Sequence, residues 1–195
     1  ETAGESMAPG GGSIAAYVGT LGVALGTMVA NLSAHKAGWD DRWEFFSEWA
    51  QKGQTYKNKL LFLVDEDTNA FNKIIDGFRM PKGSPAEKEA RMQAIEEATK
   101  YATEIPFQVM DTAFQSMEVA QAMLKDGLQS SLSDAGVGIL CARAAVLGAY
   151  FNVRINAKDI IDRDFADKIL SKAEHIYQET LKIERETIAY IDSKM

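Results

Sequence analysis

Asp67 is a carboxylate inside an apolar stripe. It follows Leu63 by four residues and precedes Phe71 by four, so the three side chains share one face of a predicted helix. A buried carboxylate is costly unless it is paired or hydrogen-bonded, and such groups often have shifted pKa values and functional roles. Asp67 is therefore a candidate proton donor or acceptor, and an ion pair with a helix neighbour is the structural alternative.

Two further titratable residues stand where predicted helices end or begin. Lys36 follows Leu32 by four residues and extends the stripe of the first helix at its C-terminal end, where a lysine also complements the helix dipole. Asp134 lies beside Ser131 and Ser133 at the start of a later helix, a spacing that a helix cap explains well. The residues alone favour these structural explanations, and acid–base roles are the alternative.

A glycine-rich segment leads directly into the first predicted helix; it consists of Pro9, Gly10, Gly11, Gly12 and Ser13. Glycines let the backbone approach a ligand, and the free N–H groups of a helix start favour an anion or a developing negative charge. A flexible end with Ser13 as the helix cap is the alternative, because short motifs of this kind often match by chance.

Polar residues also lie on the fourth predicted helix and on the link behind it. Arg143 is at the edge of an apolar face, and Asn152 and Asn156 are four residues apart with Arg154 between them. Two amides and a guanidinium near one turn can bind a planar heterocycle or a carboxylate. Capping of the fourth helix by the asparagines is the alternative.

The histidines and the cysteine give no sign of a metal centre or a covalent nucleophile. The chain has only two histidines, His35 and His175, which are far apart in the sequence, and no His/Cys cluster. Cys141 lies on an apolar face, which is typical of a core position. It is the only cysteine, so no internal disulfide can form, which suits a reducing compartment.

The composition is that of an ordinary globular protein, with 46% hydrophobic and 25% charged residues in a chain of 195. We expect one domain over residues 1–195. The net charge of -7 argues against a nucleic-acid partner, because such proteins carry basic patches. The most apolar stretch, residues 14–32, contains glycines and runs on into charged residues, so we expect no membrane span, no secretory signal and a cytoplasmic protein.

Helical periodicity covers almost the whole chain, and strand signals are nearly absent. We expect an all-α bundle of about five long helices, at residues 13–36, 40–78, 85–125, 131–151 and beyond a link at 152–158. Small residues recur on one face of the first helix and predict the close approach of another helix: Ala15, Gly19, Gly22, Gly26 and Ala30. Segments of about 40 residues exceed about 50 Å in length, which favours a bundle completed by homodimerisation.

These motifs occur together in the order found in the formiminotetrahydrofolate cyclodeaminase and methenyltetrahydrofolate cyclohydrolase family, which the chain resembles over about residues 8–162. The resemblance is carried by Ala8-Pro9-Gly10-Gly11-Gly12-Ser13, Met28-Val29 with Lys36, Asp65-x-Asp67-x-x-Ala70-Phe71, Pro81-Lys82 with Arg91, Ser133-Asp134-Ala135-Gly136-Val137 and Asn152-Val153-x-Ile155-Asn156. Residues 30–43 look most like the cyclodeaminase half of bacterial bifunctional formiminotransferase–cyclodeaminases.

The resemblance implies an enzyme that cyclises 5-formiminotetrahydrofolate to 5,10-methenyltetrahydrofolate with release of ammonia. This chemistry needs a base, an acid and the exclusion of water, but no metal and no cofactor besides the folate substrate. We predict that Asp67, Lys36 and Asp134 are the acid–base groups. We predict that the substrate is bound by Gly10, Gly11, Gly12, Ser13, Arg143, Asn152 and Asn156, and that Lys82, Arg143 or Arg154 meets the anionic folate tail.

Alternatives remain open at this point. Cyclohydrolase activity would use nearly the same groups, and a non-catalytic folate-binding or oligomerisation domain would keep the bundle without turnover. The sequence departs from the family pattern at Met7, where proline is usual, and at Gln129, where Gly-Asn is expected, and the second departure bears on turnover. The resemblance to bifunctional proteins also implies a fused or partnering formiminotransferase, and the chain starts with Glu1 instead of methionine, as an excised domain would.

Overall fold

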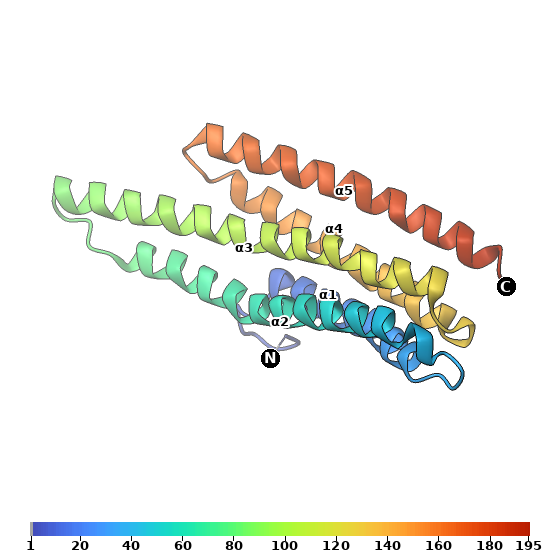
Figure 1. Cartoon of the computed structure of the whole chain (residues 1–195). Coiled ribbons are helices and arrows are strands. Elements are labelled where there is room, and N and C mark those ends of the chain that lie inside the picture. The colour runs from blue at the N-terminus through green and yellow to red at the C-terminus, as the bar shows by residue number, and fades with distance from the viewer. Residues whose placement is uncertain (1) are drawn as a thin grey trace.

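The computed structural model describes residues 2–195, which form an all-α bundle without strands (Figure 1). The predicted fold class and the five long helices are confirmed. The helices are α1 (Gly11–Ala34), α2 (Trp43–Arg79), α3 (Pro85–Asp126), α4 (Leu132–Ala157) and α5 (Arg163–Asp192), with short 3-10 turns η1 (Asp40–Arg42) and η2 (Gln129–Ser131).

Helix α1 lies between α2 and α4, and its small residues let both approach closely. A Cβ atom at Gly19 would lie 3.1 Å from the Cβ of Ala145 in α4 and 3.4 Å from Leu60 in α2. A Cβ at Gly22 would lie only 2.8 Å from the carbonyl oxygen of Gly138. The close helix contact predicted from the small-residue face is therefore present, with α4 as the nearest neighbour.

The start of α1 differs from the prediction. The helix begins at Gly11, with Gly10 as its N-cap, so Gly12 and Ser13 lie in the first turn. The interpretation of Ser13 as the helix cap is wrong, because no side chain caps this end and the Ser13 hydroxyl is used elsewhere. At the start of α3 the residues do form a cap: Ser84 and Glu87 exchange hydrogen bonds in a capping box.

The predicted link at residues 152–158 is also wrong, because α4 continues to Ala157. Asparagines are poor helix formers, which suggested a break. Here the side-chain amides of Asn152 and Asn156 donate to the carbonyls of Gly148 and Ala102. Val153, which follows Asn152, is fully buried, so packing holds this segment in the helix.

Helices α1 and α4 leave one broad apolar surface on the side away from α3. The exposed side chains, which we call the apolar face, are Ile14, Tyr17, Leu21, Met28 and Leu32 of α1 with Val137, Leu140, Phe151 and Ile155 of α4. They recur at steps of three, four, seven and eleven residues, which are all near whole numbers of helical turns, so each set forms one stripe along its helix. Because α1 packs against α4 and both pack against α3, the two stripes are neighbours.

Two helical stretches in residues 2–195 are long and apolar enough to cross a membrane, Gly11–Ala34 and Gln129–Ala157. The protein itself buries 61% and 50% of their most apolar windows. The core helix of a soluble protein passes the same test of length and composition, so these helices are weak evidence for a span.

Candidate active site

Ser13 and Asp67 form the centre of the candidate site. The Ser13 hydroxyl is fully buried and donates a 2.8 Å hydrogen bond to Oδ2 of Asp67, and it lies 3.4 Å from the hydroxyl of Thr68. A Cβ atom at Gly12 would lie 2.2 Å from Oδ1 of Asp67. The glycine segment thus makes room for the carboxyl group at the contact between α1 and α2.

Burial raises the pKa of Asp67 above its ordinary value of 3.8, and the hydrogen bonds from Ser13 act in the opposite direction. The net effect is a raised pKa, because the desolvation of the charged carboxylate outweighs the stabilisation that the hydroxyl and the backbone of Ser13 give it. A carboxyl group with a raised pKa is closer to being a usable acid or base near neutral pH. This environment is the one expected from the apolar stripe around Asp67.

Asn152 and Asn156 face Asp67 across a small cleft. The Nδ2 of Asn152 donates to the carbonyl of Gly148 at 2.9 Å, and that of Asn156 donates to the carbonyl of Ala102 at 2.7 Å. The cleft has a volume of about 130 Å³. It is lined by Met7, Ala8, Gly10, Gly11, Gly12, Asp67, Thr68, Phe71, Ile74, Ala102, Asn152 and Asn156. The chain therefore brings together the glycine segment, α2 and the end of α4.

Lys36 and Asp134 lie at the opposite end of the same helices. Lys36 lies two residues beyond the end of α1 at Ala34, which follows Gly12 by 22 residues, about 33 Å at 1.5 Å per residue, and its Nζ lies 4.0 Å from the centroid of the Trp39 ring. Asp134 precedes Asn152 by 18 residues within α4, about 27 Å. Within one chain, therefore, the predicted acid–base residues Lys36 and Asp134 do not lie at the cleft that holds Asp67.

Arg143 is in the middle of α4 and is occupied by an ion pair. Its Nε lies 3.2 Å from Oε2 of Glu184 in α5. Arg143 does not line the cleft, and neither do the two other candidates for binding the folate tail: Arg154 stacks over Tyr150, and Lys82 is exposed in the turn before α3. The predicted role of Arg143 in substrate binding stays a prediction, to which its position adds no support.

Thr68, Phe71 and Ala102 line the cleft and were missed as site residues from the sequence. Phe71 could have been found, because it lies four positions after Asp67 on the same helix face, whereas Thr68, one position after Asp67, gave no such signal. Ala102 gave no signal, because its contribution is a backbone carbonyl. Among residues 2–195, no three His, Cys, Asp or Glu side chains are grouped so that they could hold a metal ion.

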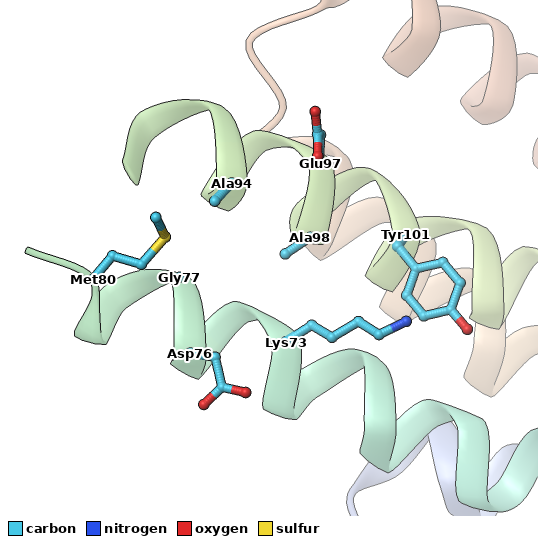
Figure 2. Close-up of a pocket in the computed structure, with 8 residues that line it drawn as sticks. All are labelled: Lys73, Asp76, Gly77, Met80, Ala94, Glu97, Ala98 and Tyr101. Atoms are coloured by element: carbon cyan, nitrogen blue, oxygen red, sulfur yellow. The ribbon is translucent and has the colours of Figure 1, made fainter. Parts of the chain in front are cut away.

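A larger pocket of about 450 Å³ lies between the ends of α2 and α3 (Figure 2). Its floor is made by the small residues Gly77, Ala94 and Ala98. Figure 2 shows Lys73 extending toward Tyr101, and its Nζ lies 3.7 Å from the centroid of that ring. None of the predicted site residues lines this pocket, so we place the candidate chemistry at the smaller cleft with its half-buried carboxyl group.

The fold and the site define an all-α protein with a half-buried carboxyl group at a glycine-lined cleft, and comparisons with known proteins assign its family. The family model for formiminotransferase-cyclodeaminase matches residues 1–175. The chain belongs to this family.

Two relatives show how the family varies in length. The chain is 31% identical over 187 residues to the methenyltetrahydrofolate cyclohydrolase of Methylorubrum extorquens, covering 96% of this chain and 90% of that protein. It is 33% identical over 179 residues to the formimidoyltransferase-cyclodeaminase of Rattus norvegicus, covering 92% of this chain but only 33% of the rat protein. The chain thus corresponds to about a third of the longer relative.

A solved structure has the same fold. The crystal structure of formiminotetrahydrofolate cyclodeaminase from Thermotoga maritima superposes with a TM-score of 0.81, covering 97% of this chain and 92% of that one. The sequence identity is 23%, so this likeness shows the fold alone.

Proposed function

We propose that the chain is a folate one-carbon enzyme that cyclises 5-formiminotetrahydrofolate to 5,10-methenyltetrahydrofolate and releases ammonia. The observation that carries the proposal is the half-buried Asp67 carboxyl group, held by Ser13 in a cleft that also contains two amides. Membership of the family and the names of its relatives support the choice of a folate substrate. We further propose that the protein acts in the cytoplasm.

Asp67 supplies the proton transfer that this cyclisation needs. Starting from the protonated amidine, N10 of the folate attacks the amidine carbon, so that an N10–C bond forms and a tetrahedral adduct results. The carboxylate takes the proton from N10 and passes it to the exocyclic nitrogen. The C–N bond then breaks, ammonia leaves, and the positive charge remains on the methenyl product. A carboxyl group with a raised pKa suits both halves of this transfer.

In this proposal, a second copy of the chain completes the site. One chain encloses only about 130 Å³ at the cleft, below the range of about 300–1,000 Å³ that is usual for ligand sites. The uncharged apolar face of α1 and α4 begins beside the cleft and is long enough to pack against the same face of another copy. A homodimer with a shared site is the arrangement that we infer.

A two-fold axis through the middle of this face would also explain where Lys36 and Asp134 lie. Both residues are at the end of the α1–α4 pair that is remote from the cleft. If the axis lies in the plane of this face and runs perpendicular to α1 and α4, it turns the remote end of one copy toward the cleft end of the other. Lys36 and Asp134 of one copy would then approach Asp67 of the second, and the three predicted acid–base groups would meet across the dimer.

Cyclohydrolase activity is the second candidate. The relative from Methylorubrum extorquens favours this activity. The chain covers 90% of that cyclohydrolase but only 33% of the bifunctional relative from Rattus norvegicus. In that reaction water adds to the methenyl carbon, and the same group, as a carboxylate, would accept a proton from the water. N5 would take up that proton as its bond to the carbon breaks, and loss of the remaining hydroxyl proton gives 10-formyltetrahydrofolate. If the cyclodeaminase reaction is correct, we expect the chain to act with a formiminotransferase, fused or separate.

The test is to supply the protein with each folate separately. With 5-formiminotetrahydrofolate, we expect the absorbance of methenyltetrahydrofolate to rise together with released ammonia. Loss of methenyl absorbance from added 5,10-methenyltetrahydrofolate, without activity on the formimino compound, would favour the cyclohydrolase. Turnover of neither folate would contradict the proposed function.

A further inference from the structure

Pro106 lies inside α3, in the middle of a helix that runs without interruption from Pro85 to Asp126. A proline has no backbone N–H, so it cannot donate to the carbonyl four residues earlier in the helix. In α3 that carbonyl belongs to Ala102, which lines the cleft. Both residues are buried, so the carbonyl of Ala102 needs a partner from elsewhere in the protein.

The partner is the side chain of Asn156 in α4. Its Nδ2 donates to the carbonyl oxygen of Ala102 at 2.7 Å. A carbonyl oxygen can only accept, so the nitrogen of the amide must face Ala102 and the oxygen, Oδ1, must face the other way. The missing N–H of Pro106 therefore determines which end of the Asn156 amide is left free.

The free end is an acceptor at the cleft. Asn156 lines the cleft, and the hydrogen bond that its side chain makes within residues 2–195 uses Nδ2, so Oδ1 is left for a ligand. Asn152 is arranged in the same way, with Nδ2 bound to Gly148. The cleft therefore presents three acceptor groups, which are Oδ1 of Asn152, Oδ1 of Asn156 and the carboxyl group of Asp67. Such a cleft suits the edge of a ligand that is rich in N–H donors.

We propose that Pro106 is a positioning residue, which fixes Asn156 so that Oδ1 accepts a hydrogen bond from an N–H of the reduced pterin ring. The inference rests on the proposed function, because it is the folate substrate that carries this ring. The 2-amino group and the ring N–H groups of a reduced pterin are the donors that such an acceptor would bind. Pro106 itself touches no substrate in this account and acts through Ala102 and Asn156.

The test is the variant Pro106→Ala, which restores an N–H that competes for the carbonyl of Ala102. We expect KM for the folate, and Kd for tetrahydrofolate, to rise about 10-fold, while kcat stays within about 3-fold, because a binding contact is lost from ground state and transition state alike. Thermal stability should be unchanged or higher, because a proline disfavours a helix interior. A purely structural proline would give no such split between KM and kcat.

Asn156→Ala should raise KM and Kd as much as Pro106→Ala does. It tests the contact of Asn156 with the folate even if Pro106→Ala does not fold. Adding Pro106→Ala to Asn156→Ala should have no further effect on KM, because both changes remove one contact. Asn72→Ala, an exposed asparagine on α2 outside the cleft, is the matched control and should leave KM unchanged.

Three results would overturn the inference: wild-type KM in Pro106→Ala, wild-type KM in Asn156→Ala, or additive effects in the double variant. Its failure is distinguishable from that of the proposed function. If the wild-type protein neither binds tetrahydrofolate nor turns over either folate, the proposed function is wrong. If the wild-type protein does both and the variants behave like it, only the role of Pro106 is wrong.

Discussion

The Ser13 hydroxyl and the Asp67 carboxylate are joined by a 2.8 Å hydrogen bond, although the residues are 54 positions apart in the sequence. The bond crosses the contact between α1 and α2, at the point where Gly12 leaves space for the carboxyl group. It fixes the orientation of Asp67, while burial raises the pKa of that carboxyl group. Changes to any of these three residues should therefore affect the same chemical group.

Gly12→Ala should misplace Asp67 and lower kcat about 10²-fold, because the new Cβ would lie 2.2 Å from Oδ1 and the carboxyl group must move. Steady-state turnover of the formimino substrate measures this. Gly53→Ala is a matched control, because its Cβ would lie equally close, 2.2 Å, to the Thr27 hydroxyl in the same helix contact but away from the cleft. We expect Gly53→Ala to lower Tm and to spare kcat, and equal losses of kcat in both variants would contradict the account.

The raised pKa of Asp67 predicts how stability depends on pH. The native state holds this proton more tightly than the unfolded state does, so the stabilising contribution is full below the ordinary pKa of 3.8 and is lost as the pH rises through the raised value. Asp67→Asn has no such titration. Urea unfolding between about pH 4 and pH 8 should show the wild-type free energy of unfolding falling relative to Asp67→Asn as the pH rises.

The control for that experiment is Asp65→Asn, which removes an exposed carboxylate two residues earlier on the same helix. The difference in free energy of unfolding between wild type and Asp65→Asn should not change with pH as the difference between wild type and Asp67→Asn does. A difference between wild type and Asp67→Asn that stays constant with pH, or that grows in favour of the wild type, would mean that the native state does not raise this pKa.

Leu21→Glu should convert the proposed dimer to monomers, because it places a charge in the middle of the uncharged apolar face. Sedimentation at micromolar concentration measures the change, and turnover should fall with the dimer. Met92→Glu introduces the same charge at an exposed position near the α2–α3 turn and should leave the dimer intact. A wild-type protein that sediments as a monomer at this concentration would rule out the dimer.

Lys36 can be tested by mixing two inactive variants, Lys36→Ala and Asp67→Asn. If each site combines Asp67 of one copy with Lys36 of the other, half of the sites in a mixed dimer lack both groups and half retain both. Refolding an equal mixture should therefore restore about a quarter of the wild-type turnover. No recovery, although each variant alone is inactive and dimeric, would show that Lys36 and Asp67 do not work in a shared site.

The sequence predicted the helices and the environment of Asp67 because both depend on local periodicity. The stripe through Leu63, Asp67 and Phe71 indicated a desolvated carboxylate, and the small residues of α1 indicated the close approach of another helix. Both features follow from residues that lie within a few turns of one another.

The rest of the site depends on contacts between helices, which periodicity does not encode. The asparagines of α4 suggested a link, and only the bond from Asn156 to Ala102 and the buried Val153 explain why the helix continues. The distance of Lys36 from Asp67 could not be predicted either. Both are polar positions on apolar stripes, and their separation depends on which ends of α1 and α2 lie together.

Turnover by Asp67→Asn tests the central claim most directly, because asparagine keeps the shape of the side chain and removes the proton that the reaction is proposed to move. Ammonia release from 5-formiminotetrahydrofolate and binding of tetrahydrofolate should be measured on the same folded preparation. The account predicts that kcat falls about 10²–10⁴-fold while Kd stays close to the wild-type value. Near-normal ammonia release by folded Asp67→Asn would contradict the account and would leave Asp67 with a structural role.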